Sequence, residues 1–335
     1  MRNVKASLLK QIPYISHIPT DGRTVFLQPY YNEEKNAFDL YHPVGDKLHI
    51  LWSHPTEMCY WSPKLVNPKN DLYIEFFDTL AKHYTVPYIL NEMIRIETDI
   101  MNCCTVVGKY FLHLNAFLET KSQAISNMVK TDLEYYFGNV RSLYDLIQSI
   151  VQHLWYIEKK IKLPDSFDKM VNKSKNDLKE KYLLSDSLIK YYDDTRELFS
   201  FCRKVRNSIH HTGRDIQVVF CMEDGFGLTK GSNILADVPF ADKIWPEEYV
   251  KKNNIVSVLA FYSYLNLRML DNMSKLSHAI LKAIKPMPTI SNNCYLYYRG
   301  YYLHHLVNAQ HYLDRQWMKP DEVKIFEDSD PEETV

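Results

Sequence analysis

One short polar stretch gathers the residues best suited to chemistry. Four of its members fall within six positions, just before Gly213: Arg206, Asn207, His210 and His211. An imidazole titrates near neutrality, so it can accept or return a proton. A guanidinium stays charged and fits the oxygens of a phosphate. A base and a phosphate-binding cation are what metal-free RNA cleavage needs, with the 2′-OH as nucleophile.

Helical geometry leaves open which histidine works with the arginine. Arg206 and His210 are four residues apart and share a helix face, whereas His211 lies about 140° further round the helix. A last turn loosened beside Gly213 would let His211 swing toward Arg206. Both histidines therefore stay candidates for proton transfer.

Two further cations, Arg203 and Lys204, precede the stretch and are expected to bind the substrate. A plainer interpretation is that cations here only stabilise the C-terminus of a helix, at about 0.3–1 kcal/mol each. Stabilisation of the helix end explains any single cation, but it explains less readily why the cations cluster with Asn207 and two histidines.

The arrangement Arg206-Asn207-x-x-x-His211 resembles the R-x4–6-H signature of the HEPN superfamily. Over residues 121–285 the pattern is similar too: a long helix, a proline-containing connection, the motif helix and a closing helix. The resemblance implies an up-down helical bundle, a homodimer whose motifs meet, and RNA cleavage without a metal or other cofactor. It assigns charge stabilisation to Arg206, orientation to Asn207 and acid–base chemistry to His211. His210 is the second candidate for the acid–base role.

Several HEPN families also use an acidic residue on the earlier helix, and Glu134 or Asp145 could fill that role. Many members are bacterial toxins or antiviral defence effectors, while others have lost activity. The resemblance therefore predicts a cytoplasmic endoribonuclease with RNA, a second copy and an antitoxin or regulatory protein as partners. The alternative is a non-catalytic HEPN-like scaffold that binds RNA, a nucleotide or a protein.

The spacing alone is not specific. Arg299 and His304 repeat it, but Gly300 follows that arginine and no capped helix leads into the segment. A metal site is also conceivable, yet no H-x3-H or H-E-x-x-H pattern supports it. Its ligands would come from His210, His211, His304, His305 and His311.

Composition excludes several classes of protein. The net charge is −1, so no global field attracts nucleic acid or membrane. The six cysteines form no C-x-x-C pair, and the vicinal Cys103 and Cys104 are expected to be buried thiols. No membrane helix is expected. With 9 glycines among 335 residues, long helices fit better than a glycine-rich sheet.

The predicted fold is mainly α: a HEPN-like up-down helical bundle with a small β hairpin and an N-terminal mixed α/β extension. The predicted divisions are an extension over residues 1–120, a bundle over 121–290, and an aromatic segment with an acidic tail over 291–335. Apolar periodicity and capping signals predict the elements. They are strands near 24–27 and 47–52, a short helix from 72, helices over 87–118, 127–160 and 250–284, a helix capped by Ser185 or Ser187 that ends before Gly213, and a hairpin over 217–228.

Two surface features have open interpretations. The lysines between 159 and 181 could form an RNA-backbone patch or a solvated helix end and linker. The tyrosines between 295 and 302 could stack on bases, although such residues more often belong to a core or an interface.

Overall fold

The computed structural model divides the chain into two units. The first comprises Met1–Asn91, Pro286–Tyr301 and Asp328–Val335, and the second comprises Glu92–Lys285 and Tyr302–Glu327. The predicted boundary at residue 120 falls at the end of a helix that lies largely in the second unit. The structure describes residues 4–5, 16–20, 23–35, 37–44, 47–55, 59–63, 72–84, 87–212, 218–232, 235–286, 294–298 and 304–323.

The first unit contains a five-stranded antiparallel sheet in the order β1-β5-β4-β3-β2. The segments near 24–27 and 47–52 lie in β3 and β5, as predicted, whereas β1, β2 and β4 were not predicted. Beside the turn between β3 and β4, Asn32 at the end of β3 donates a 2.8 Å hydrogen bond to the buried carboxylate of Asp39 in β4. The strands are β1 (Val4–Lys5), β2 (Ser16–Thr20), β3 (Arg23–Asn32), β4 (Ala37–Val44) and β5 (Lys47–Pro55).

Two further strands and a helix belong to this unit. β6 (Cys59–Pro63) pairs antiparallel with β10 (Cys294–Tyr298), so Tyr297 lies opposite Tyr60. The predicted tyrosine cluster thus begins in a strand, while Tyr301 and Tyr302 lie outside the described residues. The helix predicted from residue 72 is α1 (Leu72–His83).

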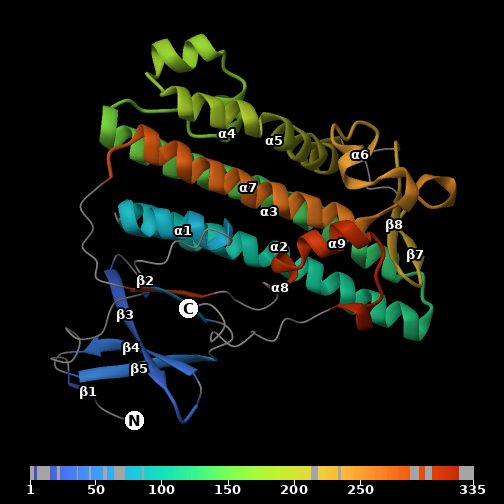
Figure 1. The fold of residues 1–335 in the computed structure, drawn as a ribbon, viewed down its shortest axis with the longest axis horizontal. Coiled ribbons are helices and arrows are strands. Elements are labelled where there is room, and N and C mark those ends of the chain that lie inside the picture. The colour runs from blue at the N-terminus through green and yellow to red at the C-terminus, as the bar shows by residue number, and fades with distance from the viewer. Residues whose placement is uncertain are drawn as a thin grey trace. The chain divides into compact units, whose positions relative to one another are not determined.

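The second unit is mainly helical and is built on four long helices that alternate in direction along the chain (Figure 1). α3 runs antiparallel to α5, because Phe137 packs edge to face with Phe201 while Tyr192 donates to Gln148. α3 runs parallel to α7, because Tyr136 contacts Tyr262 near one end and the Glu158 carboxylate accepts from the Lys285 amide near the other. The helices are α2 (Pro87–Thr120), α3 (Ile125–Lys159), α5 (Asp186–Thr212) and α7 (Val258–Ala283).

The predicted apolar faces form the core. On α3 the apolar residues that recur every three or four positions from Val129 to Leu154 are buried, but Ile157 is 37% exposed because it lies in the last turn. Cys103 and Cys104 are buried free thiols, as predicted. Among the described helices, none is both long and apolar enough to cross a membrane.

The connections differ from the predictions in two places. Residues 172–181 are not a plain linker, because Asp177–Lys181 forms a π-helical turn that buries Leu178. The closing helix begins at Val258 rather than near 250, since Ile255–Ser257 first pairs as β9 with β8. The predicted hairpin is thereby extended to a three-stranded sheet. Its strands are β7 (Phe220–Met222), β8 (Gly225–Thr229) and β9 (Ile255–Ser257).

Short elements complete the unit. Ser166 caps α4 (Phe167–Val171) by accepting from the Lys169 amide at 3.2 Å. α6 (Ala241–Ile244), α8 (His304–Val307) and α9 (Ala309–Arg315) are each shorter than eight residues.

The segment after α9 packs against the three-stranded sheet. Gln316 is 1% exposed, and its side-chain amide donates to the Ile244 carbonyl at 2.7 Å. The Ser257 hydroxyl donates to the Gln316 carbonyl. The Met318 amide donates to the Asp224 carbonyl at 3.0 Å, which attaches this segment to the β7–β8 turn.

Candidate functional site

The motif helix is α5, and its N-terminus is fixed by a side-chain cap. The Leu188 amide donates to the Ser185 hydroxyl at 3.4 Å, which selects Ser185 over Ser187 as the cap. Leu188, Tyr192 and Cys202 are buried along one face, as the apolar periodicity predicts. The helix continues to Thr212, so all the predicted motif residues lie in its last two turns.

Arg206 and Asn207 are brought together at this end of α5. Arg206 donates from Nη1 to Asn207 Oδ1 at 3.3 Å, and both side chains are half-buried. The contact fits the orienting role expected of Asn207, because an amide oxygen can hold one edge of the guanidinium. The side chains of His210 and His211, and the whole of Gly213, lie outside the described part of the chain.

The two other predicted substrate-binding cations are engaged by carboxylates. Arg203 forms a 3.0 Å ion pair with Asp168, and Lys204 forms one of 2.7 Å with Asp237. The hydrogen bond and charge of Lys204 hold the pKa of Asp237 below its ordinary value. Lys204 and Asp237 also line an open groove beside Arg196. A phosphate approaching Lys204 would have to displace the Asp237 carboxylate.

The two acidic candidates on α3 lie in different places. Asp145 pairs with Arg141 at 3.4 Å and accepts the Phe167 amide at 3.3 Å, so it fixes the start of α4. Glu134 is half-buried and lies toward the other end of α3. Because Phe137 contacts Phe201 and the helices are antiparallel, Glu134 lies at about the level of the last turns of α5. Glu134 is therefore the better placed acidic candidate.

Sequence reasoning missed a polar cluster between α2 and α3. Asp132, only 5% exposed, binds the Lys109 ammonium and, at 2.9 Å, the Nε2 atom of His113. Burial raises the pKa of Asp132, but the hydrogen bonds from His113 and Lys109 outweigh it and bring the pKa below its ordinary value. The only local signal was the i, i+4 spacing of Lys109 and His113, because Asp132 lies 19 residues beyond His113.

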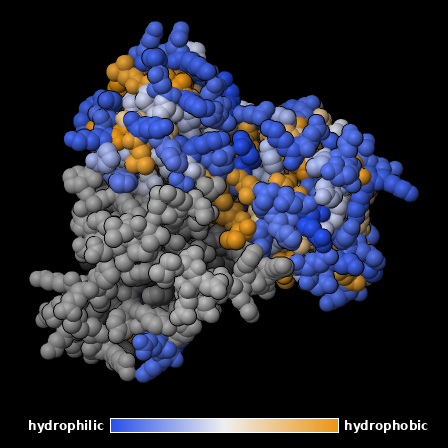
Figure 2. Space-filling view, in the orientation of Figure 1, coloured by the Kyte–Doolittle hydropathy of each residue, from blue (hydrophilic) through white to orange (hydrophobic). Residues whose placement is uncertain are grey.

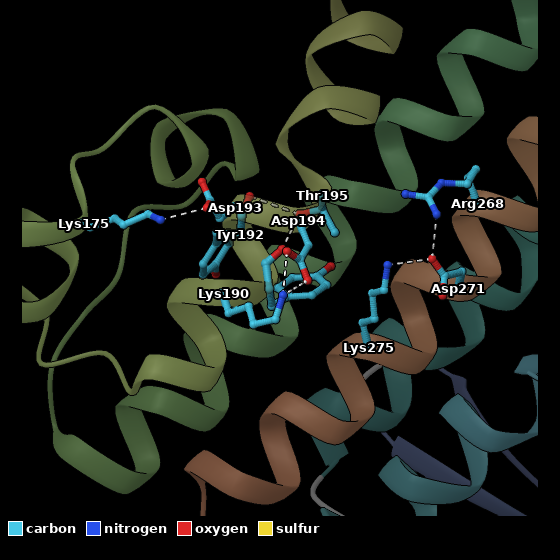
Figure 3. Close-up of polar contacts among 10 residues, drawn as sticks. Lys175, Lys190, Tyr192, Asp193, Asp194, Thr195, Arg268, Asp271 and Lys275 are labelled. Atoms are coloured by element: carbon cyan, nitrogen blue, oxygen red, sulfur yellow. Dashed lines mark hydrogen bonds and ion pairs between the residues drawn. The ribbon is translucent and has the colours of Figure 1, made fainter. Parts of the chain in front are cut away.

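Most of the lysines between 159 and 181 contact other side chains. Lys175 pairs with Asp193 at 2.9 Å (Figure 3). Lys179 pairs with Asp186 at 3.1 Å. Hydrophilic residues dominate the described surface in Figure 2, with apolar side chains in separate patches. Lys169 pairs with Asp165 at 2.8 Å, and Lys159 with Glu158 at 3.4 Å. Cation–π contacts join Lys173 and Lys181 to Tyr182, Lys159 to Trp155 and Lys160 to Tyr156.

The second match to the spacing leads into a packed segment. His305 is 5% exposed, bonds through Nδ1 to the Tyr312 hydroxyl at 2.9 Å, and stacks on Phe111. Arg299 and the side chain of His304 lie outside the described residues. Where side chains are described, no three of the His, Cys, Asp and Glu residues are grouped to hold a metal ion.

Comparison with protein families, curated proteins and solved structures gives no match to this chain. The HEPN resemblance therefore stays a prediction based on residues 206–211 and their helical context.

Proposed function

We propose that this protein is a metal-independent endoribonuclease of HEPN type that works as a homodimer. The observation that supports it best is the bonded Arg206–Asn207 pair at the end of a capped amphipathic helix among antiparallel neighbours. In this proposal His211, or His210, removes the proton of the RNA 2′-OH. Arg206 stabilises the charge that develops on the phosphate.

Cleavage by this route needs no water and no metal. The 2′-oxygen bonds to phosphorus while the bond to the 5′-oxygen breaks, and the leaving oxygen takes a proton. The products are a 2′,3′-cyclic phosphate and a 5′-hydroxyl. By analogy alone the biological setting is a toxin or antiviral effector in the cytoplasm, held in check by an antitoxin or regulatory protein.

RNA cleavage in EDTA tests the proposal. We expect wild type to cut, and Arg206→Ala and His211→Ala to lose at least about 100-fold in rate, since each removes charge stabilisation or proton transfer. Lys190→Ala, more than four turns earlier on α5 and with a side chain that is 71% exposed, is the control and should cut like wild type. Equal, weak cutting by all four proteins would indicate a contaminating nuclease and reject the proposal.

The ion pairs of Arg203 and Lys204 favour a second candidate function, a non-catalytic HEPN-like scaffold. Their carboxylate partners neutralise two cations that a nuclease would use on RNA. A scaffold would bind RNA, a nucleotide or a protein without cutting. Binding of RNA with intact strands recovered after long incubation would support this function over the first.

A further inference from the structure

The connection between α3 and α5 gathers positive charge in a protein whose net charge is −1. Residues 156–183 contain eight lysines against five acidic residues. Lys175 and Lys179 pair with Asp193 and Asp186 of α5 and add no free charge. The surplus lies on the other lysines, in a segment that projects from the helical unit above α5 in Figure 1. Positive charge is therefore concentrated locally, as attraction to an anionic surface requires.

Three of these lysines lie over aromatic rings instead of beside carboxylates. Lys160 lies 5.8 Å from the ring centroid of Tyr156. Lys173 and Lys181 lie 5.6 and 5.5 Å from the ring centroid of Tyr182. Within the described part of the chain, none of the three forms an ion pair. A ring attracts an ammonium without neutralising it, so these three charges stay available to an anion.

Leu183 is held on the outside of this connection in a strained conformation. It is 56% exposed, and its φ of 51° lies in the left-handed region that costs every residue but glycine. The residues on either side of it are buried anchors. The Trp155 indole donates to the Tyr182 carbonyl at 3.0 Å. The Leu184 amide donates to the Leu178 carbonyl at 3.0 Å. The fold thus fixes one leucine outward between two buried neighbours, and backbone strain of this kind is typical of functional positions.

Tyr156 adds a second exposed side chain with a large apolar surface. It is 52% exposed in the last turn of α3 and follows Trp155, whose indole reaches the residue before Leu183. Tyr156 and Leu183 therefore lie beside the same hydrogen bond, near the three unpaired lysines. In Figure 2, apolar atoms are exposed among hydrophilic ones over this connection. Exposed apolar side chains next to basic ones are typical of a surface that binds anionic lipid.

The contacts favour lipid over a nucleic acid strand. A single strand is held by bases that stack on open aromatic rings. Tyr182 is 8% exposed beneath two lysines, and Lys160 lies over Tyr156, so cations already contact both rings. Leu183 offers only aliphatic atoms, which gain free energy by entering the boundary of a bilayer. Tyrosine and lysine suit the same boundary, because each has an apolar body and a polar end.

We propose that this surface, called the lysine tip and defined by Tyr156, Lys160, Lys173, Lys181 and Leu183, binds the surface of an anionic lipid bilayer. The three lysines attract the anionic headgroups, while Leu183 and Tyr156 enter the headgroup region. Each lysine near such a surface raises the affinity about fivefold. Three lysines and a shallow apolar anchor give a weak, reversible attachment. The inference is independent of the proposed RNA cleavage, because Arg206 and its neighbours take no part in it.

Co-sedimentation of the full chain with vesicles tests the proposal. Phosphatidylcholine vesicles that contain about one-third phosphatidylglycerol should bind the protein, vesicles of phosphatidylcholine alone should not, and high salt should release it. Lys173→Gln combined with Lys181→Gln should weaken binding about 25-fold. The matched control is Lys243→Gln combined with Lys252→Gln, because these two lysines are exposed near the three-stranded sheet. The control should bind vesicles like wild type.

Leu183→Asn separates binding from folding. Asparagine tolerates the left-handed backbone, so the melting temperature should not fall. Vesicle binding should weaken about fivefold, because the apolar anchor is lost. Leu112→Asn is the matched control, since Leu112 is 58% exposed on α2 beside His113, which contacts the first turns of α3. A leucine with a purely structural role would instead lower the melting temperature on substitution and leave vesicle binding intact.

Four results would overturn the inference. They are no binding to vesicles, equal binding to both kinds of vesicle, equal losses for the lysine pair and its control, and unchanged vesicle binding by Leu183→Asn. Binding of a labelled oligothymidylate or of polyglutamate that depends on Lys173 and Lys181, without vesicle binding, would assign the lysine tip to that polyanion and also overturn it. None of these measurements involves RNA cleavage, so the inference and the ribonuclease proposal can fail separately.

Discussion

The helical unit contains two sets of polar contacts with the same lengths and different surroundings. One set is buried and joins helices, and the other is exposed along single helices or between a helix and a connection. Buried contacts are Tyr136–Asn266 at 2.6 Å, Tyr144–Asn272 at 2.7 Å and Tyr192–Gln148 at 2.7 Å. Exposed ion pairs are Lys190–Asp194 at 2.7 Å, Lys275–Asp271 at 2.8 Å and Lys175–Asp193 at 2.9 Å (Figure 3).

Length therefore does not indicate strength in this protein. Removing one partner of a buried pair leaves the other without water, at about 1–3 kcal/mol. Breaking an exposed pair returns both charges to water, and such pairs contribute about 0–1 kcal/mol. The buried set should thus set the stability and register of the helices, and the exposed set should contribute little.

The largest effect is expected for Gln148→Ala. Gln148 is fully buried, accepts from Tyr192 and donates to the Pro164 carbonyl at 2.8 Å. The substitution removes the hydrogen-bond partner of the Tyr192 hydroxyl and of the Pro164 carbonyl, and it leaves a cavity. The free energy of unfolding measured by urea titration should therefore fall by about 3 kcal/mol. The exposed Gln123→Ala is the control. A loss under about 1 kcal/mol for Gln148→Ala would show that the buried hydrogen bonds stabilise the protein no more than the exposed ion pairs do.

An intermediate effect is expected for Asp132→Asn, because its partners are partly exposed. The folded-state pKa of Asp132 lies below its ordinary value of 3.8, so its stabilisation is present above that pH and is lost as pH falls through the folded-state pKa. Urea titration should show a loss of about 1–2 kcal/mol at neutral pH that shrinks in more acidic solution. A deficit that stays constant down to about pH 2 would assign the loss to packing.

The smallest effect is expected for Asp194→Asn. Both carboxylate oxygens of Asp194 contact Lys190, but that lysine is 71% exposed. The free energy of unfolding should change by less than about 0.5 kcal/mol, and the difference should vanish in high salt. A loss above about 1 kcal/mol, insensitive to salt, would place this pair with the buried set.

Local signals in the sequence predicted most of the helical unit. The 3.6-residue period located α2 and α3. Ser185, one of the two caps predicted for α5, bonds to an amide within the first turn of that helix. The start of α7 was predicted too early because Ile255–Ser257 is as apolar as the helix that follows. Only its pairing with β8, far back in the chain, makes it a strand.

In the candidate site, too, contacts between residues close in sequence were predictable and contacts between helices were not. Arg206 and Asn207 are adjacent, so their contact follows from the sequence, and the role of the two histidines stays a prediction. The cluster of Asp132, Lys109 and His113 was not visible, because Asp132 meets Lys109 across 23 residues and two helices. The i, i+4 spacing of Lys109 and His113 indicates a shared helix face, but nothing in the sequence places Asp132 beside them.

The order in which the chain is synthesised matters for the Gln316 segment. Ile244 and Ser257 leave the ribosome well before Gln316, which later fills the space between them and satisfies the Ile244 carbonyl. Chains fold progressively from the N-terminus during synthesis. The Ile244 carbonyl of α6 and the Ser257 hydroxyl of β9 therefore lack their Gln316 partners until residues 304–323 emerge. A ribosome stalled before residue 304 would hold the four long helices complete, but that end of the unit unfinished.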